Sequence, residues 1–133
     1  MVHLSFKDIS RRLREQELPF FDLVIGIGTG GVVPASLVAY QLNCELIIIT
    51  LNYRDEQNTP QHEEPVIIKG LPSGLDLSDK QILLVDDVSV SGKTMNQALK
   101  ALDLPNIQTL AMKGKADHVL FPEIKDCVKW PWK

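Results

Sequence analysis

The chain has 133 residues, of which 44% are hydrophobic and 23% are charged, and its formal net charge is −3. This composition is typical of one soluble globular domain over residues 1–133, and the acidic balance argues against general attraction to nucleic acid. No apolar run is long enough to span a membrane and no signal-peptide core follows Met1, so we expect a cytoplasmic protein without a membrane partner. Two cysteines, Cys44 and Cys127, are too few for a disulfide framework, and we expect both to be reduced and buried.

The first predicted helix begins after Ser5, which stands three residues before Asp8 in the pattern of a helix N-cap. Apolar residues at helical spacing form its expected inner face: Phe6, Ile9 and Leu13. The only dense basic cluster of the sequence lies on the same helix, among glutamates: Arg11, Arg12 and Arg14. This charge pattern favours a solvated helix face over a binding site.

Apolar runs without alternation predict strands that are buried on both faces, at residues 23–27, 46–49 and 82–85. Two further helices should each bury one stripe of side chains: Val33, Leu37 and Tyr40 in the first, and Met95, Ala98, Leu99 and Leu102 in the second. Shorter strands are predicted at residues 66–68, 107–111 and 119–121, and the polar segment 53–65 is a candidate mobile loop. The alternation of strands and helices predicts an open, doubly wound, mostly parallel α/β sheet.

The most informative segment is the one in which a buried strand ends in Asp86 and Asp87 and a short turn opens a helix. Ligands bind at the carboxyl ends of the strands in such sheets, and the free N–H groups of a helix start favour a phosphate. Ser91 and Thr94 add hydroxyl donors, and Gly92 lets the backbone approach an anion closely. The two carboxylates can accept hydrogen bonds from a diol or help to hold a hydrated cation. A phosphate at one end and a diol at the other describe a ribose 5-phosphate, whereas a capped helix with solvated carboxylates is the alternative.

Residues 82–94 resemble the phosphoribosyl-diphosphate signature of the type I phosphoribosyltransferases. Residues 28–35 resemble the diphosphate loop of that family, and Trp130, Pro131 and Trp132 are similar to the terminus of its small xanthine-guanine and archaeal purine members. The resemblance implies a doubly wound α/β domain with a small C-terminal hood. It also implies transfer of phosphoribose from phosphoribosyl diphosphate to a nucleobase, such as xanthine, guanine or hypoxanthine, with Mg²⁺ as cofactor and a homodimer as the assembly.

The resemblance also implies roles for single residues. Asp86 and Asp87 are the implied catalytic carboxylates, which hold the ribose hydroxyls directly or through Mg²⁺ and water. The implied 5-phosphate turn consists of Val90, Ser91, Gly92, Lys93 and Thr94. The implied diphosphate contacts are Gly28, Thr29, Gly30, Gly31 and Arg54. Lys113 and the backbone of Val128 are the implied base contacts, although Lys115 lies close enough to compete with Lys113 for that assignment.

Three residues depart from the family pattern. Thr29 stands where many relatives have Arg or Lys, and Cys127 stands where relatives stack an aromatic ring on the base. Trp130 could supply that ring after a local shift, but packing of Trp130 in the core or in a dimer is favoured. Val90 stands where many 6-oxopurine enzymes carry an aspartate as general base, which typically contributes about 10²–10⁴-fold to the rate. Val90 therefore leaves the base open, and a nucleotide-sensing regulator without turnover is an alternative function.

The glycine-rich loop has a second interpretation. Residues 26–31 also match G-x-G-x-x-G between a strand and a helix, which would suit a small dinucleotide-binding domain. That fold needs an acidic residue at the end of the second strand, where this sequence has Asn52 and Tyr53. The phosphoribosyltransferase interpretation explains both loops, whereas the dinucleotide interpretation explains one.

Overall fold

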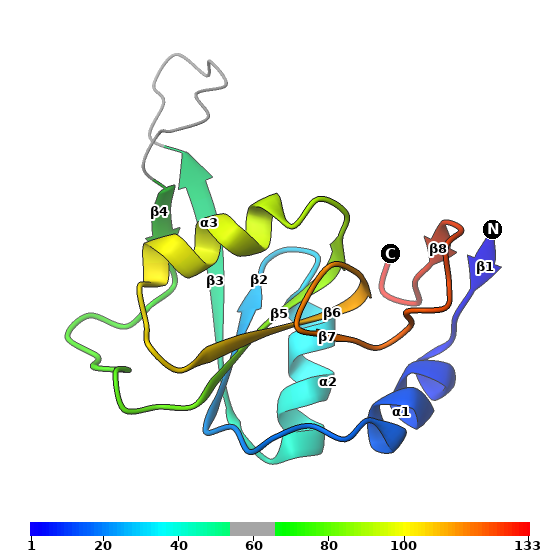
Figure 1. The fold of residues 1–133 in the computed structure, drawn as a ribbon, viewed down its shortest axis with the longest axis horizontal. Coiled ribbons are helices and arrows are strands. Elements are labelled where there is room, and N and C mark those ends of the chain that lie inside the picture. The colour runs from blue at the N-terminus through cyan, green and yellow to red at the C-terminus, as the bar shows by residue number, and fades with distance from the viewer. Residues whose placement is uncertain (54–65) are drawn as a thin grey trace.

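The computed structural model describes residues 1–53 and 66–133 (Figure 1). The helices are α1 (Phe6–Glu15), α2 (Val32–Leu42) and α3 (Lys93–Leu102). The strands are β1 (Val2–His3), β2 (Leu23–Ile27), β3 (Glu45–Tyr53), β4 (Val66–Lys69), β5 (Ile82–Ser89), β6 (Ile107–Gly114), β7 (His118–Val119) and β8 (Val128–Lys129). Of the predicted loop 53–65, only Tyr53 is described, as the last residue of β3, so the implied diphosphate contact Arg54 lies outside the described residues.

Six strands form the central sheet in the order β4-β3-β2-β5-β6-β7, and β4 alone runs antiparallel to its neighbour. Alternate residues of β2 enter different cores, because Val24 packs with α1 and α2 whereas Ile25 packs with α3. Helices α1 and α2 therefore cover one face of the sheet and α3 covers the other, as Figure 1 shows. This arrangement confirms the predicted doubly wound, mostly parallel fold.

Helix α1 begins as predicted. The side chain of Ser5 accepts a hydrogen bond from the N–H group of Asp8, and the Asp8 carboxylate accepts one from the N–H group of Ser5. Burial of Ile9 and Leu13 confirms two of the three residues of the expected inner face. Phe6 remains 45% exposed, and its ring lies 6.3 Å from that of Trp132.

The predicted inner stripe of α2 is only partly confirmed, because Leu37 packs against the core but Tyr40 does not. The helix buries Pro34, Ala35, Val38 and Ala39, whereas Tyr40 is 88% exposed. Nearly every residue of α2 is apolar, so the spacing of apolar residues could not single out the face that meets the sheet. The structure selects small side chains there, because a Cβ atom on Gly26 of β2 would lie only 2.5 Å from the Cβ of Ala35.

The other predicted elements are largely confirmed. Met95 and Ala98 of α3 are buried, and Leu99 and Leu102 pack against them in the core. The run at residues 46–49 is less buried than predicted, because β3 has only the short strand β4 beyond it; Leu46 is 38% exposed. None of the helices in the two described ranges is long and apolar enough to cross a membrane.

The N-terminal and C-terminal ends of the described chain lie side by side (Figure 1). Strand β1 pairs in parallel with β8 in a separate two-stranded sheet that was not predicted, since strands of two residues carry no periodicity. Trp130 is buried and stacks on Trp132 with ring centroids 5.2 Å apart, which confirms packing in the core. Cys127, just before β8, is exposed rather than buried, and Cys44 is partly buried; both are free thiols. We call residues 118–133 the hood.

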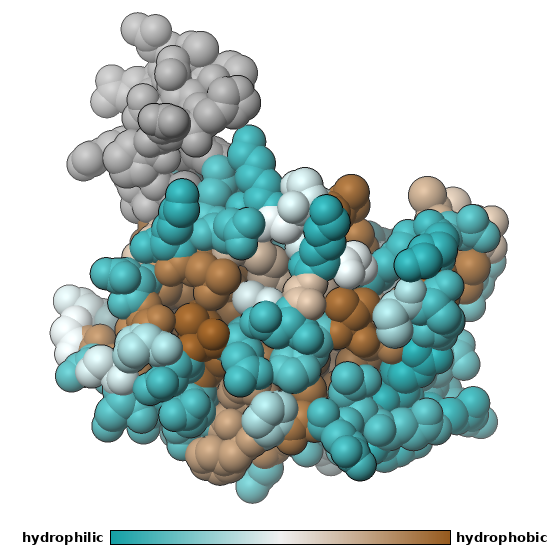
Figure 2. All heavy atoms as spheres, in the orientation of Figure 1, coloured by the Kyte–Doolittle hydropathy of each residue, from teal (hydrophilic) through white to brown (hydrophobic). Residues whose placement is uncertain are grey.

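On the face shown in Figure 2, hydrophilic side chains surround scattered apolar patches. Large apolar side chains that are exposed on the described residues include Phe20, Tyr40, Leu75 and Val90.

Candidate active site

Asp86 and Asp87 lie near the carboxyl end of β5, the strand at the centre of the sheet, and they are only 9% and 7% exposed. One oxygen of Asp86 accepts the N–H group of Asp87 at 2.8 Å, and Oδ1 of Asp87 accepts the N–H group of Val88 at 2.8 Å. The other oxygen of Asp87, Oδ2, forms an ion pair with the Nζ atom of Lys133 at 2.8 Å. Sequence reasoning gave Lys133 no role in this site.

The surroundings of the two carboxyl groups shift their pKa values in opposite directions. Burial raises the pKa of Asp86 to about 7, and the neighbouring charge of Asp87 adds to this effect, while the hydrogen bond from the Asp87 backbone opposes it. Burial also pushes the pKa of Asp87 upward, but the Lys133 ammonium and the Val88 N–H group outweigh it, so the net pKa is lowered. The pair therefore holds one carboxylate that is firmly ionised and one that gains charge when a cation or hydrogen-bond donor approaches.

The turn between β5 and α3 forms a hollow of about 240 Å³ lined by residues 88–94. Helix α3 starts after Gly92, whose φ of 81° favours glycine, and this N-cap residue offers no side chain to cap the helix. Ser91 Oγ accepts the Lys93 N–H group at 3.2 Å, and the first regular helical bond runs from the Asn96 N–H group to the carbonyl of Gly92. The N–H groups of Thr94 and Met95 are thus left for an anion, so the structure brings the predicted phosphate turn to a helix start.

The glycine-rich loop between β2 and α2 lies against the carboxylate pair, and its Gly28–Thr29 peptide bond is cis. The N–H groups of Gly28 and Gly31 already donate to the carbonyls of Ile49 and Ile27. The N–H groups of Thr29 and Gly30 therefore remain as the candidate anion donors of this loop. The backbone N–H groups of Gly28 and Gly31 are excluded from the predicted diphosphate contacts. A Cβ atom on Gly30 would lie 2.7–2.8 Å from three atoms of the Asp87 carboxylate, so the two predicted loops meet at this point.

A wider cavity of about 420 Å³ opens beside the phosphate turn, and Val88 and Val90 line both. Lys113, at the end of β6, lines this cavity, and its Nζ atom donates to the carbonyl of Asp126 at 2.6 Å; its contact with a base stays a prediction. Lys115 and Gly114 line the cavity beside it, and the hood adds lining residues that sequence reasoning missed: Phe121, Pro122, Ile124 and Lys125. These hood residues follow strand β7, and their meeting with β5 is a tertiary contact that no local pattern signals. Val128 lies in β8 and does not line this cavity, so its contact with a base stays a prediction.

The chain is similar to known proteins over most of its length. The model of the phosphoribosyl transferase domain matches residues 5–110. The chain belongs to this family. The bifunctional protein PyrR of Limosilactobacillus reuteri is 34% identical over 102 residues, which cover 71% of this chain and 57% of PyrR. The xanthine-guanine phosphoribosyltransferase of Gluconobacter oxydans is 28% identical over 138 residues, which cover 98% of this chain and 79% of that enzyme.

Among solved structures, the purine phosphoribosyltransferase of Pyrococcus horikoshii Ot3 superposes with a TM-score of 0.75 at 23% identity, covering 99% of this chain and 93% of that one. This similarity shows a shared fold. The chain spans between half and three fifths of the length of the PyrR proteins that it matches, at 57%, 59% and 50%. Membership in the phosphoribosyl transferase domain family favours the diphosphate interpretation of the glycine-rich loop over the dinucleotide interpretation.

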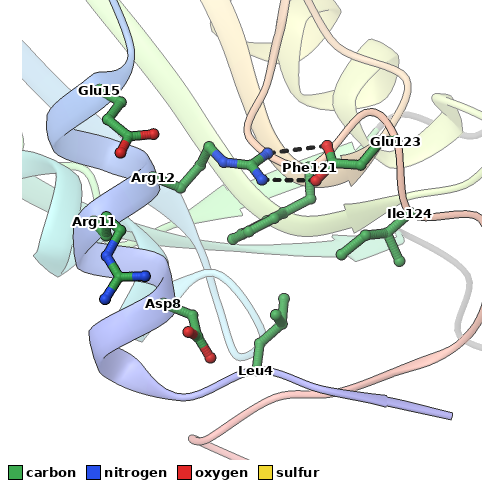
Figure 3. Close-up of a pocket in the computed structure, with 8 residues that line it drawn as sticks. All are labelled: Leu4, Asp8, Arg11, Arg12, Glu15, Phe121, Glu123 and Ile124. Atoms are coloured by element: carbon green, nitrogen blue, oxygen red, sulfur yellow. Dashed lines mark hydrogen bonds and ion pairs between the residues drawn. The ribbon is translucent and has the colours of Figure 1, made fainter.

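A third cavity, of about 230 Å³, separates α1 from the hood (Figure 3). Arg11 and Arg14 are exposed, as predicted for the arginine cluster, but the prediction is wrong for Arg12. Arg12 is not simply solvated, because its guanidinium donates to both carboxylate oxygens of Glu123 at 3.0 and 2.6 Å and to the carbonyl of Leu120 at 2.6 Å. The same guanidinium lies 4.5 Å above the ring of Phe121. The hydrogen bonds from Arg12 lower the pKa of Glu123 to about 2. We call this set of contacts the Arg12 clasp.

Proposed function

We propose that this protein transfers phosphoribose from phosphoribosyl diphosphate to a nucleobase and releases diphosphate. The observation that carries the proposal is the position of the buried Asp86–Asp87 pair. It touches Gly30 of the glycine-rich loop on one side and leads, on the other, into the uncapped start of α3. The carboxylates thus lie between two backbone anion sites, as a sugar with phosphate groups at both ends requires.

The proposed substrate position follows from these donors and acceptors. The 5-phosphate takes the N–H groups at the start of α3 and the hydroxyls of Ser91 and Thr94. The ribose hydroxyls donate to Asp86 and Asp87. Diphosphate takes the N–H groups of Thr29 and Gly30, and Arg54 is a proposed further contact. Because Thr29 has a hydroxyl where many relatives have a cation, the leaving group receives less charge compensation from this loop.

The donor set fits Mg²⁺ that arrives with its substrate. Asp86 and Asp87 offer the hard oxygen atoms that Mg²⁺ prefers, and Mg²⁺ commonly binds one or two carboxylates while it keeps water and phosphate ligands. The described residues include no group of three or more His, Cys, Asp or Glu side chains that could hold a metal alone. When bound, Mg²⁺ would neutralise charge on the departing diphosphate. Lys133 already neutralises Asp87, so the ion and this lysine would compete for one carboxylate.

The proposed acceptor site is the cavity of about 420 Å³ beside Val90. A purine such as xanthine, guanine or hypoxanthine fits the implied role of Lys113 as donor to an exocyclic oxygen, with the backbone of Val128 as a further proposed contact. The predicted single domain, homodimer and cytoplasmic location remain parts of this proposal, and sedimentation of the purified protein measures its oligomeric state.

The decisive experiment measures diphosphate release from phosphoribosyl diphosphate and Mg²⁺ with a panel of nucleobases. We expect turnover with at least one base, and a loss of kcat/KM of about 10²–10³-fold in Asp86→Asn and in Asp87→Asn. Asp79→Asn, which changes an exposed aspartate in the turn before β5, is the matched control and should keep wild-type kinetics. If no base releases diphosphate and the sugar diphosphate does not bind, the proposal is wrong.

A non-catalytic regulator is the second candidate function, and Val90 favours it. Val90 is 79% exposed at the mouth of the acceptor cavity, and a valine cannot take a proton from the incoming base. A regulator would bind phosphoribosyl diphosphate or nucleoside monophosphates at α3 but release no diphosphate with any base. Calorimetric titration beside the turnover assay distinguishes the two functions.

A further inference from the structure

The acceptor cavity has an unusual distribution of charge. Three lysines line it, Lys113 and Lys115 at the end of β6 and Lys125 in the hood. The described residues that line this cavity include no aspartate or glutamate. Its other walls are apolar, with contributions from Val88, Val90 and Ile124 among others. The described part of the cavity therefore offers cationic donors at its edge and apolar surface for the face of a ring, without a side chain that accepts a proton.

None of these three lysines forms an ion pair with a carboxylate of the residues that the structure describes. The Nζ atom of Lys113 is held by the main-chain carbonyl of Asp126 at 2.6 Å, and that of Lys125 by the carbonyl of Pro122 at 3.2 Å. These neutral partners orient the ammonium groups but leave their charge in place, and each ammonium keeps two more donors. The carboxylate of Glu123 in the hood is already engaged by both terminal guanidinium nitrogens of Arg12, and the exposed Asp126 contributes its main-chain carbonyl to Lys113.

This distribution selects among acceptors. A neutral base must lose a ring proton as it reacts, and a positioned general base is worth about 10²–10⁴-fold in that step. A base that enters as an anion needs no such group, but its charge needs compensation once it leaves water. Among its described residues the cavity has no side chain that accepts a proton, and it has three lysines. Both properties suit a base that enters as an anion.

We infer that the acceptor is an oxygen-rich nucleobase that reacts as an anion, with Lys113, Lys115 and Lys125 holding its negative charge. This inference rests on the proposed function. In the reaction, a ring nitrogen of the anionic base forms the bond to C1 of the ribose with its lone pair. The bond from C1 to the diphosphate oxygen breaks and its electron pair leaves on diphosphate. The new bond cancels the negative charge of the base, so no protein group has to take up a proton in this step, and the remaining imidazole proton passes to solvent. A general base is then not needed at the position of Val90, which has only to make an apolar contact with the ring.

The test compares kcat/KM for xanthine, a base whose ring ionises readily, with that for hypoxanthine, guanine, uracil and adenine. We expect xanthine to exceed all four of the others by at least about tenfold, and the rate with xanthine to rise with pH as xanthine ionises. Lys115→Met and Lys125→Met should each lower kcat/KM for the anionic base by about 10–100-fold, as expected for a lost hydrogen bond to a charged group. Lys100→Met, on the exposed side of α3, is the matched control and should change neither.

The outcomes separate this inference from the proposed function. Equal or faster turnover of a neutral base, or unchanged kinetics in both lysine variants, would overturn the inference and leave phosphoribosyl transfer intact. Absence of diphosphate release with all five bases would overturn the proposed function and the inference with it.

Discussion

The meeting of the two loops at Gly30 makes a sharp prediction for Gly30→Ala. The added Cβ atom would lie 2.7 Å from Oδ2 of Asp87 and 2.8 Å from both Cγ and Oδ1. Ordinary contact begins near 3.4 Å, so the carboxylate must retreat by up to 3.4 − 2.7 = 0.7 Å. It cannot do so freely, because Asp87 is buried and is held at 2.8 Å by Val88 and at 2.8 Å by Lys133.

Two effects of this displacement can be measured. Overpacking of this kind costs about 1–3 kcal/mol in the free energy of unfolding. A carboxylate moved from its place also loses a charge-assisted hydrogen bond to the ribose, which is worth roughly 1.5–3 kcal/mol, or about 10–100-fold in Kd. We therefore expect Gly30→Ala to bind phosphoribosyl diphosphate about 10–100-fold more weakly while it remains folded. Isothermal titration calorimetry and urea unfolding measure the two quantities.

Gly74→Ala is the matched control for this substitution. Gly74 has a φ of 75°, and a Cβ atom there would meet nothing within 4 Å, so alanine strains only the backbone, at a cost of about 1–2 kcal/mol. This control should lose stability comparably but keep the wild-type Kd. If Gly30→Ala also kept the wild-type Kd, the two loops would not act on one ligand and our account of the site would be refuted.

Three further predictions test the charged groups. Because burial raises the pKa of Asp86 from 3.8 to about 7, the free energy of unfolding of the wild type falls as the pH rises through 7. Asp86→Asn removes this effect and should raise the free energy of unfolding near pH 8 by on the order of 2–4 kcal/mol. Below about pH 4 the substitution should not raise it, and urea titrations in metal-free buffer at the two pH values measure the difference. Lys133→Met should lower the free energy of unfolding by about 0.5–1 kcal/mol, because the ion pair that it removes is half exposed. Added Mg²⁺ should reduce that loss, and a loss that does not depend on Mg²⁺ would contradict competition between the ion and Lys133 for Asp87. Arg12→Met should cost about 1–3 kcal/mol in urea unfolding by leaving the Leu120 carbonyl without its donor, whereas Glu123→Gln, which keeps that donor, should cost less than about 1 kcal/mol.

The parts of the fold that the sequence predicts are those specified by local chemistry. Strands β2 and β5 read as apolar runs because they are buried on both faces, and α1 is marked by its own capping residues. The buried face of α2 was missed because an almost wholly apolar helix takes its orientation from the sheet beneath it. The β1–β8 pair was missed because two residues at each end of the chain acquire strand geometry only from each other.

The candidate site divides in the same way. The turn between β5 and α3 was predictable because a strand end, two carboxylates and a helix start follow one another within a few residues. The partner of Asp87 was not, since Lys133 reaches it only after the hood has folded against the domain. The lysines of the acceptor cavity come from β6 and from the hood, so their common charge is visible only in three dimensions.

The Arg12 clasp connects α1 to the segment of the hood that lines the proposed acceptor cavity. Phe121 and Ile124 line both the cavity beside α1 and the acceptor cavity. Arg12 lies over the ring of Phe121 and binds the flanking Leu120 carbonyl and Glu123 carboxylate, so it fixes the segment that also carries Lys125. Loosening the clasp should therefore move one wall and one cation of the acceptor cavity without touching the sugar-phosphate site. In Arg12→Met, KM for the base should rise while Kd for phosphoribosyl diphosphate stays at its wild-type value. An equal change in both constants would mean that the substitution disturbs the whole fold and not the acceptor cavity alone.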